Sequence, residues 1–267
     1  MTQVRDVIAS GGLGASIEAM RAQNREVVVR CDKHGEFTRE DMFRYDVGAN
    51  ECPKCHEERQ KAFWHEQKVK TAMRFFQTSS GVPARFQDSG FEGYMPENEK
   101  SEKVVSLLQE YAENFEGHRK LGRSLILCGK TGTGKTHLAC AVLRYLAEQH
   151  GVCGKYATAY RAVQEIRASY KSHDLTELQA MDAFIAPDML VLDEIGVQYG
   201  TDSEQLLLFT ILNGRYEALR PSIIVSNLTA AEVAKVLGDR VYDRLRENGG
   251  GVLAFDWGSW RQKGGRS

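Results

Sequence analysis

The sequence has neither a long hydrophobic run nor an excess of charge of one sign. No apolar stretch approaches the roughly 20 residues of a membrane-spanning helix, and the opening stretch MTQVRDVIASGGLGAS lacks an apolar run of signal-peptide length. We therefore expect a cytoplasmic protein with no membrane association. The 35 basic and 36 acidic residues give a net charge of −1. This balance excludes a bulk polycation, so any contact with nucleic acid would depend on a local patch.

The six cysteines are not interpreted as a disulfide set, because a reducing compartment keeps thiols reduced. Three of them are scattered through apolar segments and are interpreted as small buried side chains. These are Cys128, Cys140 and Cys153. The other three lie in a charged region, 31–55, which has too few periodic apolar positions to build its own core. That group needs a different explanation.

The pattern of apolar residues divides the chain near residue 80. Segment 56–77 carries apolar residues at roughly helical spacing with charges between them, which predicts an exposed helix. Gly81 and Pro83 would break that helix. We therefore place a boundary between an N-terminal region, 1–79, and a second domain, 80–267.

Short apolar runs alternate with helical segments in the second domain. Segment 101–115 predicts a helix with Ser101 as its cap. Strands that alternate with helices indicate a parallel sheet covered on both faces. The expected strands are 124–128, 155–159, 188–193, 222–227 and 251–256. The fold class is therefore α/β, with a five-stranded parallel sheet preceded by a small N-terminal domain.

The stretch GKTGTGKT, residues 129–136, fits the phosphate-binding pattern G-x-x-x-x-G-K-[ST] and lies between a predicted strand and a predicted helix. Glycines bring backbone N–H groups close to phosphate oxygens, and the helix adds its positive end. Lys135 would reach the β- and γ-phosphates, and Thr136 would offer its hydroxyl to Mg²⁺. The expected nucleotide-binding residues are Gly129, Lys130, Thr131, Gly132, Thr133, Gly134, Lys135, Thr136 and His137.

An acidic pair ends the predicted strand in MLVLDEIG. Asp193 and Glu194 thus lie at the edge where an open parallel sheet binds its ligands. Asp193 would hold Mg²⁺ directly or through water, and Glu194 could activate a water molecule that attacks the γ-phosphate. The pair favours hydrolysis over transfer of phosphate to a small molecule, which needs a water-free site. The alternative is that Glu194 only caps the next helix.

Two further features follow later in the chain. Asn227 ends the run SIIVSN and could contact the γ-phosphate or the attacking water, although asparagine also favours turns. Arg240 and Arg244 are four residues apart, so they share one helix face. Such a face is usually solvated. In an ATPase that assembles into rings or spirals, however, an arginine can reach the γ-phosphate of a neighbouring subunit.

Cys31-x-x-His34 and Cys52-x-x-Cys55 form two closely spaced pairs with a short loop between them, which suits tetrahedral Zn²⁺. Four protein ligands leave no open position, so the metal would be structural and would supply folding energy. His56 could replace one of these ligands. The alternatives are a redox Cys-Pro-Lys-Cys pair, for which no thioredoxin-like context is visible, and unliganded thiols in a flexible tail.

The phosphate loop, VLDEIG, IIVSN and LGDRVYDRLRE, in this order, resemble the DnaC-type replicative helicase loaders of bacteria and phages, which are AAA+ ATPases. GVPARF and FDWGSWR are similar to the same family. The resemblance covers about residues 80–262 and is loose before residue 80. IstB-type transposition helpers and DnaI-type loaders share this core. The resemblance therefore implies an AAA+ P-loop fold.

The resemblance also implies roles for the motif residues. Lys135 and Thr136 match the nucleotide-binding pair, and Asp193 and Glu194 match the metal-holding and water-activating acids. Asn227 matches the first sensor.

Other residues match positions at contacts with neighbours. Arg240 and Arg244 correspond to the two arginines that act between subunits, with Arg244 as the finger. Tyr170, Thr201 and Ser203 fall where such loaders face single-stranded DNA. An aromatic side chain can stack on any base, although an aromatic residue at a helix end is more often involved in packing.

The function implied by the resemblance is ATP-dependent loading of a hexameric, DnaB-type replicative helicase onto single-stranded DNA when replication starts. ATP hydrolysis would be the switch that releases the helicase. The cofactors would be ATP, Mg²⁺ and Zn²⁺. The chains would assemble into a spiral or ring on the helicase. The N-terminal region would dock the helicase through the apolar residues of 56–77, or those residues would pack on their own nucleotide domain. The alternatives are a transposition helper ATPase on duplex DNA, a small-molecule phosphotransferase, and an adaptor whose zinc element carries the function.

Overall fold

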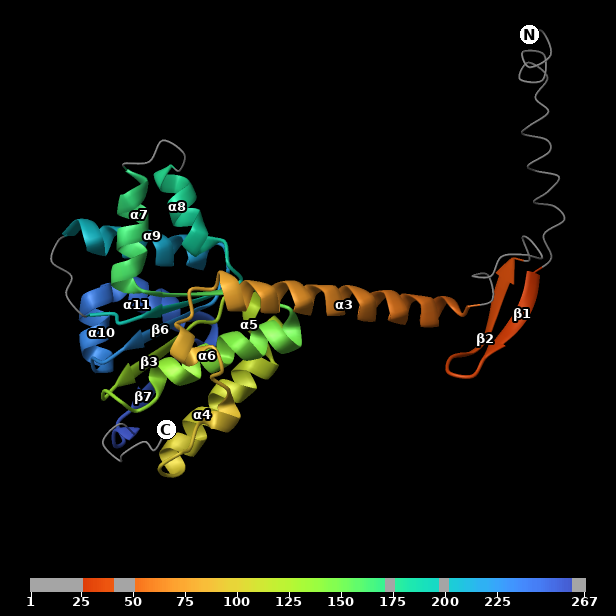
Figure 1. The fold of residues 1–267 in the computed structure, drawn as a ribbon, viewed down its shortest axis with the longest axis horizontal. Coiled ribbons are helices and arrows are strands. Elements are labelled where there is room, and N and C mark those ends of the chain that lie inside the picture. Colours follow the sequence, from red (N-terminus) through yellow and green to blue (C-terminus); the bar gives the residue numbers. More distant parts are fainter. Residues whose placement is uncertain (1–25, 41–50, 171–175, 197–201, 261–267) are drawn as a thin grey trace, which may run out of the picture. The chain divides into compact units, whose positions relative to one another are not determined.

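The computed structural model describes residues 26–40, 51–170, 176–196 and 202–260, which form two compact units that divide between Trp64 and His65 (Figure 1). Helix α3, Pro53–Thr78, contributes residues to both units. The domain boundary predicted between residues 79 and 80 stays a prediction. Within the described part of the chain, no helix combines the length and apolar character that crossing a membrane would require.

The N-terminal unit contains a hairpin that is not among the elements expected from the sequence. Strands β1, Glu26–Cys31, and β2, Gly35–Glu40, pair in antiparallel register, with Cys31 opposite Gly35. Gly35 has a φ of +78°, a left-handed conformation that glycine adopts without strain, so the chain can reverse directly after His34. The turn therefore places Cys31 and His34 close together.

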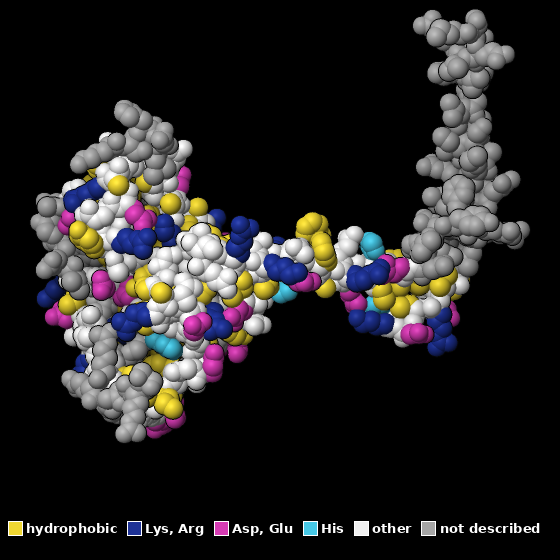
Figure 2. All heavy atoms as spheres, in the orientation of Figure 1, with side chains coloured by type: hydrophobic (Ala, Val, Ile, Leu, Met, Phe, Trp, Pro, Cys, Tyr) yellow, Lys and Arg dark blue, Asp and Glu magenta, His cyan; other side chains and the backbone are white. Residues whose placement is uncertain are grey.

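Helix α3 begins three residues before the predicted helix 56–77 and ends one residue after it. In its second half, Phe76 is 3% exposed and Met73 packs against the hydrophobic core. In its first half, Phe63 and Trp64 are exposed, and their rings meet edge to face with centroids 5.5 Å apart. Figure 2 shows hydrophobic, basic and acidic side chains interleaved along this helix. The apolar residues of 56–77 are thus divided between packing on the nucleotide domain and exposure.

The second unit is built on a five-stranded parallel sheet with strand order β4-β5-β6-β3-β7. The strands are β3 Leu125–Gly129, β4 Gly154–Thr158, β5 Met189–Asp193, β6 Ser222–Ser226 and β7 Gly251–Phe255. All five expected strands are present, and each observed end lies within one residue of the predicted end. The α/β class with a five-stranded parallel sheet is confirmed.

Alternate residues of each strand feed two hydrophobic cores, one on each face of the sheet. In β3, Leu125 and Leu127 join one core, and Ile126 and Cys128 join the other. The first face is covered by α4 Glu99–Glu113, α5 Phe115–Lys120 and α6 Lys135–Tyr145 (Figure 1). The second face is covered by α7 Ala159–Ser169, α8 Glu177–Ile185, α9 Asp202–Glu217, α10 Ala230–Leu237 and α11 Asp239–Arg246.

Single helical turns complete this unit. The 3-10 turns are Ala84–Phe86, Phe91–Gly93 and Glu247–Gly249, and a π-helical turn, Leu146–His150, extends α6. Of the three cysteines interpreted as buried, two are at most 1% exposed and Cys153 is half-buried. Burial raises the pKa of the Cys140 thiol, which keeps it protonated and unreactive.

The cap of α4 corrects one detail of the sequence prediction. Asn98, not Ser101, is the N-cap, and its side chain accepts a hydrogen bond from the Ser101 N–H at 3.0 Å. The Ser101 hydroxyl accepts a hydrogen bond from the Asn98 N–H at 2.9 Å, which makes a reciprocal capping box. The prediction was wrong by one turn because asparagine caps helices as well as serine does.

Arg215 ties α8 and α9 to the amino ends of two strands. It lies near the end of α9 and is only 1% exposed. Its guanidinium donates to the hydroxyl of Ser222 and to the carbonyls of Phe184, Ile185, Pro187 and Pro221, at 2.5–2.9 Å. Burial lowers its pKa to about 9, so it stays protonated at neutral pH. One side chain thus joins the ends of α8 and α9 to the starts of β5 and β6.

Candidate nucleotide and metal sites

A cleft of about 640 Å³ lies over the carboxyl end of the sheet, next to the phosphate loop. Asp193, Glu194 and Asn227 line it together with loop residues 131–137. The remaining lining comes from Arg85, Phe86, the segment 93–97, Trp257, Gly258 and Trp260. The structure therefore brings the loop, both acids and the sensor asparagine of the sequence prediction to one cavity.

The loop after β3 has the backbone geometry that its glycines permit. Gly132 and Gly134 have φ values of +80° and +91°, and Gly134 immediately precedes α6. Lys135 begins α6 and is 5% exposed, with its ammonium donating to the carbonyls of Gly129 at 2.9 Å and Lys130 at 2.6 Å. A concave loop with a buried lysine at a helix N-terminus is a phosphate-binding arrangement.

His137 points to the rim of the cleft. Its ring nitrogens lie 3.2 Å from the Ser89 hydroxyl and 3.0 Å from the Gly90 carbonyl oxygen. These contacts join the first turn of α6 to the segment that precedes the second 3-10 turn. Lys130 and Thr131 are exposed on the loop.

Asp193 ends β5 and is held by three donors. One carboxylate oxygen accepts from the Thr136 hydroxyl at 2.8 Å and from the Tyr156 hydroxyl at 2.9 Å, and the other accepts from the Glu194 N–H at 2.7 Å. Asp193 is 5% exposed, so its orientation is fixed. Burial is the main cause that raises the pKa of Tyr156, and the negative charge of Asp193 raises it further. The Tyr156 hydroxyl therefore stays protonated and remains a donor. Tyr156 was missed from the sequence, because an aromatic residue inside a strand is indistinguishable from a core residue.

Glu194 and Asn227 have exposed side chains at neighbouring strand ends. Glu194 follows β5 and has a φ of +59°, a left-handed conformation that is costly for a residue with a side chain. Asn227 follows β6, the strand between β5 and the loop-bearing β3. Both residues line the cleft, and this topology places Asn227 between the phosphate loop and the acids.

The two arginines of α11 have different surroundings. Arg240 is exposed, whereas Arg244 is half-buried with its guanidinium 4.6 Å from the centre of the Tyr216 ring. One terminal nitrogen of Arg244 is buried without a hydrogen-bond partner among the described residues.

Of the three residues expected to face DNA, two are described by the structure. Tyr170 follows the last turn of α7 and is 56% exposed, and its hydroxyl donates to the Glu177 carboxylate at 3.2 Å. Ser203 is exposed in the first turn of α9. Thr201 lies outside the described residues.

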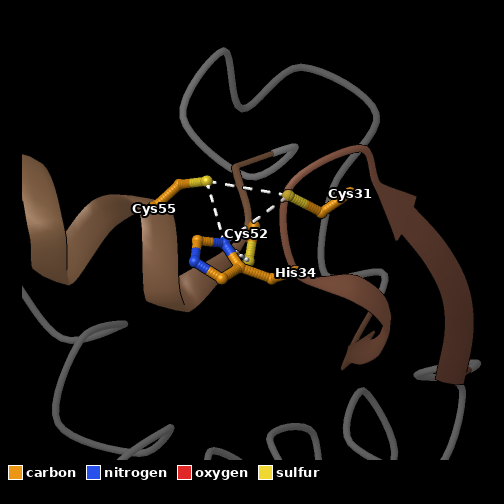
Figure 3. Close-up of side chains that lie close together, drawn as sticks. All are labelled: Cys31, His34, Cys52 and Cys55. Atoms are coloured by element: carbon orange, nitrogen blue, oxygen red, sulfur yellow. Dashed lines mark hydrogen bonds between the residues drawn. The ribbon is translucent and has the colours of Figure 1, made fainter.

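The second candidate site is the cysteine and histidine cluster of the N-terminal unit. The side chains of Cys31, His34, Cys52 and Cys55 point toward one another from the hairpin and from the start of α3 (Figure 3). Their ligand atoms all lie within 4.8 Å of one another. The two short ligand pairs of the sequence therefore converge on one point.

The distances within this cluster fit a tetrahedral zinc ion. The sulfurs of Cys31 and Cys55 are 3.6 Å apart, and the Nδ1 of His34 lies 3.3–3.7 Å from all three sulfurs. Zinc bonds of about 2.3 Å to sulfur and 2.0–2.1 Å to nitrogen, at tetrahedral angles, place two sulfurs about 3.8 Å apart and a sulfur and a nitrogen about 3.6 Å apart. A sulfur–sulfur distance of 3.6 Å is too long for a disulfide.

Partners outside the cluster support the same set of ligands. The Nε2 of His34 is 3.1 Å from a carboxylate oxygen of Glu58, an arrangement that orients Nδ1 toward a metal. His56 instead contacts Glu51 at 3.1 Å and Gln60 at 2.9 Å, so the structure places it outside the cluster.

The electrostatics of the cluster also favour a cation. Hydrogen bonds from the backbone N–H groups of His34 and Lys33 are the main cause that lowers the pKa of Cys31 to about 6. The hydrogen bond to Cys31 raises the pKa of Cys55 to about 11, because two adjacent sulfurs cannot both carry a negative charge. A divalent metal ion would relieve this repulsion and allow every thiol to ionise.

The fold and the cleft define the class of this protein, a nucleotide-binding AAA+ P-loop protein. The model of the IstB-like ATP-binding protein family matches residues 102–247. The replicative helicase loader DnaC of Escherichia coli K12 is 31% identical over 205 residues, which are 77% of this chain and 82% of that protein. DnaC of Buchnera aphidicola subsp. Baizongia pistaciae is 34% identical over 185 residues, 69% of this chain and 74% of that protein.

The chain belongs to the family of IstB-like ATP-binding proteins and DnaC-type helicase loaders. Solved structures agree in fold. The crystal structure of the DnaC helicase loader has a TM-score of 0.59 at 23% identity. The match covers 65% of this chain and 100% of the chain in that structure. The DnaI crystal structure has a TM-score of 0.53 at 19% identity, and the match covers 66% of this chain and 93% of that chain. The predicted family resemblance is confirmed.

Proposed function

We propose that this chain loads a hexameric replicative helicase onto single-stranded DNA, and that ATP binding and hydrolysis set when the helicase is held and released. The observation that carries the proposal is the 31% identity with a replicative helicase loader over 77% of the chain. The loop, acids and sensor asparagine that line one cleft supply the nucleotide chemistry. The predicted N-terminal region, 1–79, would dock the partner, and the predicted second domain, 80–267, would bind and hydrolyse ATP.

The residues of the cleft can divide the chemistry of ATP hydrolysis among them. Lys135 would neutralise charge on the β- and γ-phosphates, and the loop N–H groups would bind phosphate oxygens. Thr136 and Asp193 would hold Mg²⁺, which withdraws charge from the phosphates when bound. Glu194 would accept a proton from the attacking water, and Asn227 would orient that water.

We expect Tyr156→Phe to raise the Mg²⁺ concentration that gives half-maximal nucleotide binding by about tenfold or more, since the loss is one hydrogen bond to a charged group. The substitution removes only the hydroxyl that donates to Asp193. The carboxylate would then be less firmly oriented toward the metal. Titrating Mg²⁺ against a fluorescent ATP analogue gives this value without relying on turnover.

Tyr111→Phe is the matched control for that variant. Tyr111 is also buried, and its hydroxyl donates to the Arg123 carbonyl at 2.7 Å, away from the cleft. Both variants should lose similar thermal stability, whereas only Tyr156→Phe should change the Mg²⁺ requirement. An equal Mg²⁺ requirement in the two variants would assign Tyr156 a packing role alone.

The arginines of α11 would act between subunits of an assembly. Arg240 is exposed in the chain, and Arg244 would leave the Tyr216 ring to reach the γ-phosphate of a neighbour. Stacking on an aromatic ring is weak enough to be exchanged for a contact with phosphate. This exchange would couple ATP binding in one subunit to α11 of the next.

Single-stranded DNA would contact the exposed side chains near Tyr170 and Ser203, together with Thr201. Base stacking on Tyr170 does not depend on sequence, which suits a loader that must act on any opened strand. The face of the second unit seen in Figure 2 intersperses basic and acidic side chains. Phosphate contacts on that face would therefore be few, and binding would be weak without the assembly.

The N-terminal unit would hold one structural Zn²⁺ through Cys31, His34, Cys52 and Cys55. The metal would fix the hairpin to the start of α3 in a unit that has little core of its own. We propose that the exposed pair Phe63 and Trp64 contacts the helicase, because adjacent exposed aromatic side chains are typical of docking sites.

Gel filtration of the chain mixed with a DnaB-type replicative helicase, with and without ATP, tests the proposal. A loader should elute with the helicase when ATP is present and separate from it after hydrolysis. The same mixture with an IS21-type transposase and duplex DNA tests the alternative suggested by the IstB-like family model. Binding to the transposase but not to the helicase would reject the loader function.

A further inference from the structure

Two segments that are remote in sequence contact the phosphate loop, and both also line the cleft. Tyr94 donates its hydroxyl to the Thr133 carbonyl at 2.9 Å, and the indole N–H of Trp257 lies 3.2 Å from the same oxygen and 3.1 Å from the Tyr94 hydroxyl. The backbone N–H of Trp260 donates to the Gly132 carbonyl at 2.9 Å. We call Tyr94, Trp257 and the Trp260 backbone the loop clamp.

The clamp fixes the direction of the loop N–H groups through peptide geometry. In a trans peptide, the carbonyl of one residue and the N–H of the next point in opposite directions. Because the Thr133 carbonyl points to Tyr94 and Trp257, the Gly134 N–H points away from them. The Gly132 carbonyl likewise fixes the N–H of Thr133. The clamp thus fixes the directions of two N–H groups of the phosphate loop.

Two loop glycines allow the clamp to approach this closely. A Cβ atom on Gly134 would lie 2.4 Å from the Tyr94 ring, and one on Gly132 would lie 2.1 Å from the Ser259 hydroxyl. These glycines therefore make room for the covering segments as well as for phosphate. Trp257 itself is buried, at 6% exposed.

The segment that carries Trp257 is itself anchored on both sides. The Phe255 carbonyl accepts from the Lys130 N–H at 2.8 Å, at the start of the loop. Asp256 pairs with Lys100, and the Gly258 N–H donates to the Glu97 carboxylate at 2.8 Å. The clamp thus connects the loop to the amino end of α4 and to the end of β7.

We propose that Tyr94 and Trp257 are positioning residues that hold the phosphate loop in its nucleotide-binding conformation. The proposal rests on nucleotide binding at this loop and is independent of the helicase. The two donors share one acceptor, so each can partly replace the other. Removing both leaves the buried Thr133 carbonyl without a side-chain donor and frees its peptide to rotate.

The test compares Tyr94→Phe, Trp257→Phe and the double variant by calorimetric titration with ATP and with ADP. Each single variant should weaken binding by about threefold and the double variant by about thirtyfold or more, because a shared acceptor makes the losses non-additive. ATP and ADP should lose affinity equally, since both carry the phosphates that the loop binds. KM for ATP should rise by the same factor, whereas kcat should change less.

Tyr111→Phe again serves as the control, because it removes one buried hydroxyl-to-carbonyl bond elsewhere in the same unit. It should lower the thermal midpoint about as much as Tyr94→Phe and leave the affinity for ATP unchanged. An unchanged affinity in the folded double variant would overturn the proposal. So would an equal loss of affinity in Tyr111→Phe, which would reveal a general stability effect.

Discussion

Replacing Glu194 with glutamine is expected to leave ATP binding within about twofold and to lower ATP hydrolysis about a hundredfold or more. Glutamine keeps the size of the side chain but cannot accept a proton from water. Glu194 is exposed to the cleft, directly after the buried Asp193. ATP titration and phosphate release, measured with single-stranded DNA and the helicase present, give the two values.

Glu113→Gln, at the exposed end of α4, is the matched control and should retain full turnover. The Glu194→Gln variant should also keep the helicase bound in ATP, because release would depend on hydrolysis. Undiminished turnover in that variant would remove Glu194 as the base. A loss of ATP binding would instead point to a structural role at its strained backbone position.

Cys52→Ser should reduce bound zinc from about one ion per chain to almost none and unfold the N-terminal unit, because structural zinc contributes about 10–16 kcal/mol of folding free energy in small domains. Cys52 is the most buried of the four ligands, at 6% exposed, so little can replace it. Metal analysis of the purified chain and circular dichroism measure the two effects. ATP affinity should be unchanged, since the cluster lies in the other unit.

Cys153→Ser provides the comparison for that variant. Cys153 is half-buried in the nucleotide unit and is not one of the cluster residues, so its replacement should leave the zinc content at one ion per chain. Full retention of zinc by Cys52→Ser would show that the set of ligands is wrong. Loss of ATP binding by that variant would show that the two units depend on each other to fold.

Much of the nucleotide unit could be predicted because its information is local. Each strand is a short apolar run, and each functional residue of the cleft follows such a run or opens a helix. Asp193 and Asn227 could be placed at one edge because parallel strands end on the same side. The zinc cluster was similarly suggested by close spacing within each pair of ligands.

The parts that could not be predicted depend on contacts between distant segments. Tyr94 and Trp257 meet at Thr133 only after the sheet has formed. Trp257 lies in the family-like stretch FDWGSWR, but nothing local in that stretch indicates a contact with the phosphate loop. Tyr156 is an ordinary strand residue until its hydroxyl reaches Asp193. The β1–β2 hairpin is missed for another reason, since its short strands have little apolar patterning and its turn is tied to the cysteine cluster.

Arg215 is a fixed point around which α8 and α9 could tilt. It fixes both helices at their carboxyl ends, beside the starts of β5 and β6. Ser203 lies near the opposite end of α9, about 18 Å away at 1.5 Å per residue, and Tyr170 contacts the first residue of α8. A tilt of about 10° around Arg215 would move that far end by about 3 Å. Single-stranded DNA bound at that end could therefore tilt both helices. The β-strands that lead to Asp193 and Asn227 would keep their register.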